Sequence, residues 1–211
     1  MSVLAWAAVA LSAPLDWWAA TVGAKRAESV LKPLVLLALL AAAWAMGATD
    51  SAAGWWVLAA LVLSLAGDVA LLSESEGRFV AGLASFLLAH VAYVVAFALT
   101  GMPSGRLALV GAAIVVAAAA TAGRRIVPAA AREGGAALGG ACAAYMAVIG
   151  AMVVAAWATG RPLVALGATV FMVSDTVLAW NRFVRPLRWG TLAVMATYHV
   201  GQVLIVLGLL R

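Results

Sequence analysis

The chain has 211 residues, of which 67% are hydrophobic and only 10% are charged. Soluble domains are about 45–50% apolar, so a chain with a mean hydropathy of +1.12 is not expected to be a soluble protein. The formal net charge of +5 does not indicate nucleic-acid binding, because the basic residues lie between apolar runs, where cytoplasmic loops carry them. The composition therefore predicts an integral membrane protein.

Apolar segments follow one another along the whole chain. A membrane-spanning helix needs about 20 mostly apolar residues, and turn or charge signals separate eight such segments. The predicted spans cover approximately residues 2–22, 33–47, 55–72, 78–99, 106–122, 137–159, 163–180 and 189–210. Pro14 and Asp16 interrupt the first span, and Lys32 opens the second. We predict an all-α, polytopic transmembrane helical bundle of eight spans, with residues 1–211 forming one integral membrane domain.

The basic residues are distributed unevenly between the loops. If successive loops lie on alternate sides, one side carries ten Lys and Arg residues and the other carries three. Cytoplasmic loops carry the excess of Lys and Arg, so the side with ten is predicted to face the cytoplasm. An even number of spans then places both termini outside.

The third and fourth predicted spans resemble the seventh and eighth. Asp68 lies in the last part of the third span and His90 follows inside the fourth, while Asp175 lies in the last part of the seventh and His199 follows inside the eighth. The Asp-to-His separations are 22 and 24 residues. This pattern indicates a possible parallel internal repeat of four plus four helices, and the alternative is coincidence in an alanine-rich chain.

The acids and histidines inside spans are candidate catalytic residues. An Asp at the centre of a membrane helix costs about 2.5–3.5 kcal/mol, so Asp68 and Asp175, interpreted as the only acids well inside spans, should face the bundle interior or a wet cavity. His90 and His199 are the two histidines of the chain, and both are intramembrane. Their depths predict a polar cavity open to the cytoplasm or the inner leaflet. The alternative is that these side chains only hold helices together.

Other polar side chains could line the same cavity. Residues three or four apart share a helix face, which groups Tyr93 with His90 and Gln202 with Tyr198. Lys32, Tyr145 and Asn181 also fall in the predicted cytoplasmic half. No glycine-rich phosphate loop, CxxC pair, HExxH or GxSxG motif occurs in the sequence.

Several of these residues stand in short motifs that follow one another in a fixed order. The motifs are Lys32-Pro33, Gly67-Asp68, His90 with Tyr93, Phe171-Met172-Val173-Ser174-Asp175, Asn181 and Tyr198-His199-Val200-Gly201-Gln202. Their order and spacing, from the second span to the eighth, resemble the lysoplasmalogenase family, which comprises the bacterial YhhN-like membrane proteins and their animal counterparts. No single motif is specific, but the order and spacing together are.

The resemblance implies an eight-span enzyme that hydrolyses the vinyl ether bond of lysoplasmalogens. The products would be a fatty aldehyde and a glycerophosphoethanolamine or glycerophosphocholine. The site residues it implies are Lys32, Asp68, His90, Tyr145, Ser174, Asp175, Asn181 and His199. Ser174 comes from the resemblance alone. A lysophospholipid would be the substrate, in a bacterial inner (plasma) membrane with the site toward the cytoplasmic half.

Vinyl ether hydrolysis needs a protonated acid, an anion beside the developing cation and a base for water. Two carboxylates in different environments can divide such roles, so one of Asp68 and Asp175 is expected to be the acid and the other the anion. His90 or His199 could be the base, and Lys32 with Arg182 or Arg185 could hold the phosphate.

No cofactor is expected, although two His and two Asp would also suit Zn²⁺. The expected partners are the lysophospholipid substrate and membrane lipids, with no nucleic acid, and the oligomeric state is left open. The rival hypothesis is a lipid or proton-coupled transporter, or a lipid-binding protein, that uses the same Asp and His residues.

Overall fold

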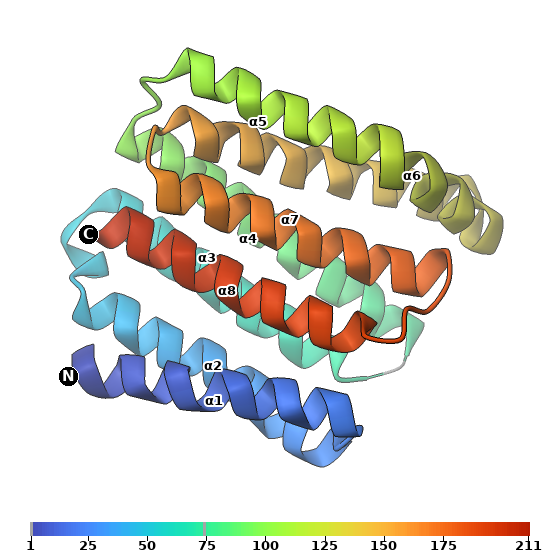
Figure 1. The fold of residues 1–211 in the computed structure, drawn as a ribbon, viewed down its shortest axis with the longest axis horizontal. Coiled ribbons are helices and arrows are strands. Elements are labelled where there is room, and N and C mark those ends of the chain that lie inside the picture. Colours follow the sequence, from blue (N-terminus) through green and yellow to red (C-terminus); the bar gives the residue numbers. More distant parts are fainter. Residues whose placement is uncertain (1, 74) are drawn as a thin grey trace. The chain divides into compact units, whose positions relative to one another are not determined.

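The computed structural model describes residues 2–73 and 75–211, and within them the chain forms helices and no strand. The α-helices are α1 (Ser2–Val22), α2 (Lys25–Ala45), α3 (Ala52–Leu71), α4 (Glu76–Thr100), α5 (Gly105–Ala118), α6 (Arg124–Ala158), α7 (Pro162–Phe183) and α8 (Gly190–Leu210) (Figure 1). A 3₁₀ turn, η1 (Ala48–Asp50), precedes α3, and a π-helical turn, η2 (Ala119–Gly123), follows α5. The prediction of an all-α membrane protein is confirmed.

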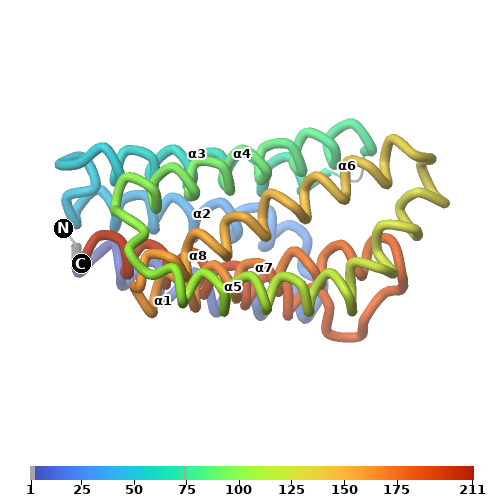
Figure 2. Tube along the Cα trace, turned by 90° about the horizontal axis from the view of Figure 1, so that it is seen from above, coloured from blue at the N-terminus to red at the C-terminus, as the bar shows by residue number. Residues whose placement is uncertain are grey.

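Among the described residues, seven helices are long and apolar enough to cross a membrane, and one of these covers the 54 residues Gly105–Ala158. This long helix contains the fifth and sixth predicted spans. Its backbone leaves helical geometry at Gly134 and Gly135, and Gly135 has a φ of +69°, which glycine adopts without steric cost. α5 packs against α6, and Figures 1 and 2 show the chain reversing at this turn. The two predicted spans are therefore antiparallel arms of one helical segment.

Two predicted connections are wrong in the same way. Residues 124–133, predicted to lie in a loop, are helical, and α2 begins at Lys25 rather than at residue 33. Lys, Arg, Glu and Ala are good helix formers, so their charges mark the limits of an apolar span and not the limits of a helix. Apart from these two places, and with η2 counted as the end of α5, the helices begin and end within three residues of the predicted bounds.

The chain divides into two compact units, the first comprising the chain up to Gly101 together with Val206–Arg211, and the second Met102–Ile205. The boundary after Gly101 falls between the two predicted halves of four spans. The internal repeat and the single domain both stay predictions.

Small residues set the helix spacing within each unit. In the first unit a Cβ atom at Gly67 would lie 2.6 Å from the Phe86 ring, and the Ser85 hydroxyl donates to the Leu63 carbonyl oxygen at 2.6 Å. In the second unit a Cβ atom at Gly201 would lie 3.0 Å from the carbonyl oxygen of Gly167. Glycine lets membrane helices approach closely, so α3 and α4, and likewise α7 and α8, are held at a short separation.

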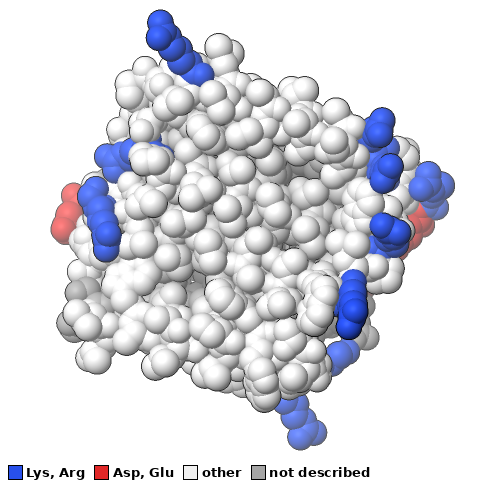
Figure 3. All heavy atoms as spheres, in the orientation of Figure 1, with Lys and Arg blue, Asp and Glu red and all other residues white. Residues whose placement is uncertain are grey.

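The surface has the charge distribution of a membrane protein. On the face drawn in Figure 3, the middles of the helices are covered by uncharged side chains, and Lys and Arg side chains lie near helix ends. Large apolar side chains such as Leu109, Val3 and Leu11 are exposed. This is the surface expected of helices that face lipid along their middles.

Candidate functional site

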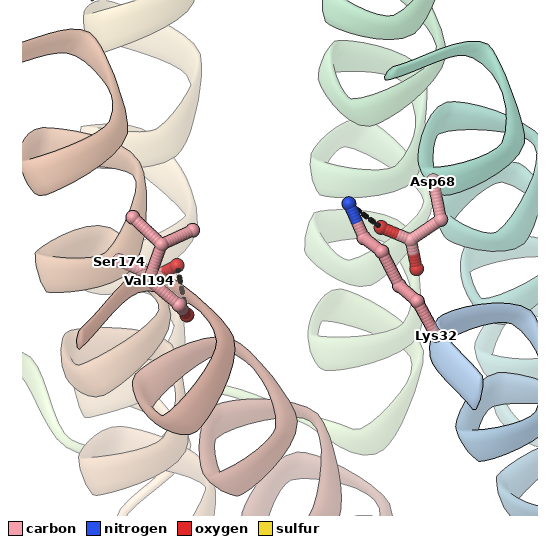
Figure 4. A network of polar contacts seen from close by, with 4 residues as sticks. All are labelled: Lys32, Asp68, Ser174 and Val194. Carbon is pink, nitrogen blue, oxygen red and sulfur yellow. Dashed lines mark hydrogen bonds and ion pairs between the residues drawn. The ribbon is translucent and has the colours of Figure 1, made fainter. Parts of the chain in front are cut away.

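A buried ion pair joins α2 and α3 in the first unit. Lys32 Nζ lies 3.2 Å from Asp68 Oδ1, and the two side chains are 6% and 1% exposed (Figure 4). Each charge alone would be costly in the interior, and their close pairing offsets that cost. α2 packs against α3, and this contact brings the two predicted site residues together.

Lys32 lies deeper than the sequence predicted. Because α2 begins at Lys25, Lys32 stands about two turns inside the helix rather than at its start. The Lys32 side chain is 6% exposed and contacts Asp68, so its ammonium group does not extend to the surface of the protein. The geometry favours a Lys32 that holds Asp68, and its predicted phosphate contact stays a prediction.

Asp16 on α1 is a third buried charged group of the first unit, and sequence reasoning missed it. Its residue exposure is 0%, so the expectation that Asp68 and Asp175 are the only acids well inside spans is wrong. The charged groups that act on its carboxyl are Glu28, Lys32 and Asp68. The signal was present in the sequence, since an acid in an apolar run is costly wherever it stands, but Asp16 was interpreted as an interruption of the span.

His90 and Tyr93 on α4 are both fully buried in the first unit. They are three residues apart, so they share the inward face of the helix. The Tyr93 ring stacks with Phe97 at a centroid distance of 6.0 Å. The predicted inward orientation of His90 and Tyr93 is therefore observed, and their roles stay predictions.

In the second unit, α6 and α7 bring together two predicted residues. The Tyr145 hydroxyl donates a hydrogen bond of 2.6 Å to Asp175 Oδ2. Tyr145 is buried and Asp175 is half-buried. A hydrogen bond from a neutral donor to a carboxylate stabilises the ionised form of the acid, and for Asp175 that donor is the Tyr145 phenol.

Two other predicted site residues of α7 bind backbone groups. The Ser174 hydroxyl donates to the Val194 carbonyl oxygen of α8 at 2.9 Å (Figure 4). The Asn181 side-chain oxygen accepts from the Leu187 backbone N–H at 3.0 Å, which holds the loop between α7 and α8. Both residues thus have a structural contact, and substrate contacts for them stay predictions.

The predicted residues of α8 are buried, while Arg182 is not. Tyr198, His199 and Gln202 are all nearly inaccessible, and the Tyr198 ring meets Phe171 edge-on at a centroid distance of 5.2 Å. Arg182 is 42% exposed and forms an ion pair of 2.5 Å with Glu133. Arg182 therefore lies on the surface of the second unit, where it is paired with Glu133.

The structure thus forms two contacts between predicted site residues, Lys32 with Asp68 and Tyr145 with Asp175. Asp68 belongs to the first unit and Asp175 to the second, so their joint action stays a prediction. Within residues 2–73 and 75–211, no group of three or more His, Cys, Asp or Glu side chains could hold a metal ion.

Comparison with known proteins connects this buried polar set to a family. The model of the YhhN family matches residues 27–209. The chain belongs to the YhhN family. Its family match begins at residue 27, after α1, so Asp16 lies outside the matched range.

Named relatives of this YhhN protein are enzymes. It is 32% identical to lysoplasmalogenase TMEM86B of Homo sapiens over 199 residues, which cover 93% of this chain and 77% of the relative. It is 31% identical to lysoplasmalogenase TMEM86B of Mus musculus over 184 residues, covering 87% and 76% of the two chains. No solved structure matches the chain. The predicted family and the prediction of an enzyme are confirmed.

Proposed function

We propose that this YhhN protein hydrolyses the vinyl ether bond of lysoplasmalogens, releasing a fatty aldehyde and a glycerophosphoethanolamine or glycerophosphocholine. The observation that carries the proposal is its similarity, along 93% of the chain, to a protein named lysoplasmalogenase. The substrate shares the membrane with the protein, since its single hydrocarbon chain partitions with lipids. The buried Lys32–Asp68 contact and the partly buried Tyr145–Asp175 contact supply polar groups within helices that are mostly apolar.

The chemistry of a vinyl ether determines what the site must provide. A proton adds to the carbon distal to the ether oxygen, and the oxygen lone pair stabilises the resulting oxocarbenium ion. Water then adds to the carbon beside the oxygen, and the hemiacetal collapses to an aldehyde and an alcohol. The demanding step creates a positive charge, so a fixed negative group nearby lowers its barrier.

Asp68 fits the role of that fixed negative group. The ammonium of Lys32 at 3.2 Å favours the ionised form of the Asp68 carboxyl. Burial to 1% exposure of the side chain strengthens any electrostatic interaction it makes, because little water screens it. We assign Asp68 to stabilisation of the oxocarbenium ion, and we keep His90 and His199 as candidate bases for water.

Turnover of purified protein in detergent tests the proposal. Three substrates are compared, namely lysoplasmenylethanolamine, lysophosphatidylethanolamine and an alkyl-ether analogue, with fatty aldehyde as the measured product. The expected result is aldehyde from the vinyl ether alone, because the saturated ether cannot form the oxocarbenium ion by protonation at carbon. Release of fatty acid from the ester, or no turnover of any of the three, would overturn the proposal, and the latter would favour a carrier.

We also propose that the protein lies in a bacterial inner (plasma) membrane with both termini outside and the site toward the cytoplasmic half. Support comes from the distribution of the Lys and Arg residues. With the buried Lys32 left out, nine lie on the predicted cytoplasmic side and three on the opposite side. Cytoplasmic segments carry the excess of Lys and Arg. A C-terminal reporter that is active only in the cytoplasm should be silent. A strong reporter signal would contradict this orientation.

A further inference from the structure

Asp16 stands out among the buried charged groups of the first unit. Its side chain is fully buried on α1, and neither of its carboxyl oxygens has a hydrogen-bond partner among the described residues. α1 packs against α2, and the charged groups that act on Asp16 are Glu28 and Lys32 of α2 and Asp68 of α3. A carboxyl group in this position has no local donor to stabilise a negative charge.

The surroundings of Asp16 favour its neutral, protonated form. A buried carboxylate without a hydrogen bond or a paired cation is among the costliest groups in a protein. Lys32, the cation that acts on Asp16, is in contact with Asp68, and the carboxyl groups of Glu28 and Asp68 disfavour a further negative charge. With Asp16 protonated, the buried set of Asp16, Lys32 and Asp68 has no net charge.

We propose that Asp16 is the proton donor of the hydrolysis, an assignment that rests on the proposed function. The O–H bond of the Asp16 carboxyl breaks, and its proton forms a C–H bond with the distal vinyl carbon, using the π-electron pair of the double bond. The ether oxygen then shares its lone pair with the adjacent carbon, which gives the oxocarbenium ion. Asp16 is left as a carboxylate.

This transfer leaves the summed charge of the substrate and the buried set of Asp16, Lys32 and Asp68 unchanged. The new carboxylate on Asp16 is matched by the positive charge of the oxocarbenium ion, while Asp68 remains matched by Lys32. Water then forms a bond to the oxocarbenium carbon and releases a proton to the base, for which His90 and His199 are the candidates. The base returns this proton to the Asp16 carboxylate, which restores the starting state. The hemiacetal hydroxyl proton ends on the departing alcohol oxygen as the C–O bond breaks, so the balance needs only one water molecule.

The assignment separates the two roles that a single acid could not fill. Asp68, held by an ammonium, is the ion that stabilises the cation, and Asp16, without a cation of its own, is the acid. When the environments of two carboxyl groups differ in this way, one can stay protonated while the other is ionised at the same pH, and enzymes commonly use such pairs.

Substitution of Asp16 tests the assignment against a matched control. Asp16→Asn keeps the size of the side chain and removes the proton donor, so kcat/KM should fall at least about a hundredfold. Asp16→Glu should restore part of the rate and shift the alkaline limb of its pH profile. The control is Ser12→Ala, because Ser12 is buried one turn earlier on α1 and donates only to the Ala8 carbonyl oxygen of its own helix; this variant should keep wild-type turnover.

Infrared difference spectroscopy provides a readout that does not depend on turnover. At neutral pH the wild-type protein should show the C=O stretch of a protonated carboxylic acid, which Asp16→Asn should lose and Ser12→Ala should keep. If the wild-type protein has no lysoplasmalogenase activity, the proposed function fails, and the spectrum still decides the protonation of Asp16.

Three results would overturn the assignment itself. The first is wild-type turnover by Asp16→Asn in a preparation that is active on the vinyl ether. The second is a protonated-acid band that is absent from the wild-type protein or unchanged in Asp16→Asn. If Asp16→Asn does not fold, Asp16→Glu decides: the third result is an alkaline limb of its pH–rate profile that lies at the same pH as that of the wild-type protein.

Discussion

Asp68 in the first unit is held by the ammonium of Lys32 at 3.2 Å, whereas Asp175 in the second accepts a hydrogen bond of 2.6 Å from the Tyr145 phenol. Asp68 is almost inaccessible, and Asp175 is half-buried. The sequence context makes these two acids look equivalent, but their partners differ in charge and their surroundings differ in access to water. The lesson is that corresponding positions in a sequence do not imply corresponding electrostatics.

The largest expected difference between the two acids is in stability. Asp68→Asn leaves the buried Lys32 without its partner, and breaking a buried ion pair costs about 3–5 kcal/mol. Asp175→Asn removes the negative charge that accepts the Tyr145 hydrogen bond, and a hydrogen bond to a charged group contributes about 1.5–3 kcal/mol. Thermal unfolding of the two variants in the same detergent measures the difference.

A double variant separates the effect of charge from the effect of shape. Lys32→Met combined with Asp68→Asn removes both charges, so it should recover most of the stability lost in Asp68→Asn alone. It should not recover activity. Equal unfolding temperatures for Asp68→Asn and Asp175→Asn would show that the ion pair is no stronger a constraint than the phenol contact.

The next effect is on turnover, where both acids should matter. Asp68→Asn and Asp175→Asn should each reduce kcat/KM by about a hundredfold, the scale on which a lost charge-stabilising group acts. The measurement is aldehyde release per folded molecule, with folded protein quantified by size-exclusion chromatography. Near-normal turnover by either variant would remove that acid from the reaction.

The variant Lys32→Met tests whether the Lys32 ammonium binds the substrate phosphate or acts on Asp68. Loss of its ion pair with Asp68 should lower kcat/KM by roughly tenfold to a hundredfold, since a neighbouring cation favours the ionised form of a carboxyl group by about one to three orders of magnitude. The loss should be equal for lysoplasmenylethanolamine and for an alkenyl glycerol that lacks the phosphate headgroup. A defect that shrinks for the headgroup-free substrate would restore Lys32 to phosphate binding.

Tyr145→Phe should have the smallest effect. It removes one neutral donor from Asp175, and water can replace the phenol because Asp175 is only half-buried. We expect roughly a tenfold loss of kcat/KM, the lower end of the range for a hydrogen bond to a charged acceptor. A loss as large as that of Asp175→Asn would mean that the phenol takes part in proton transfer.

The fold was predictable because apolar length is a strong signal. Each span needs a long stretch of mostly apolar residues. The limits of these stretches predicted the helix ends everywhere except at two places. The exceptions, residues 25–32 and 124–133, are helical segments that contain charge. Hydropathy reports where a helix can meet lipid, and it does not report where the backbone hydrogen bonding stops.

The candidate site was only partly predictable. Asp68, His90 and His199 were found because polar groups in an apolar helix are costly, and all three are buried. Their partners could not be found, because the Lys32–Asp68 contact depends on how α2 packs against α3. Asp16 was missed since it stands beside Pro14 and was interpreted as a break in the span.

The most direct test of the central claim is hydrolysis of lysoplasmenylethanolamine in D₂O, with the fatty aldehyde trapped at once and analysed by mass spectrometry. Protonation at carbon from an exchangeable acid predicts one deuterium per aldehyde, on the carbon beside the carbonyl group. Aldehyde without deuterium at that carbon, or no aldehyde at all, would contradict an acid-catalysed vinyl ether hydrolysis by this protein.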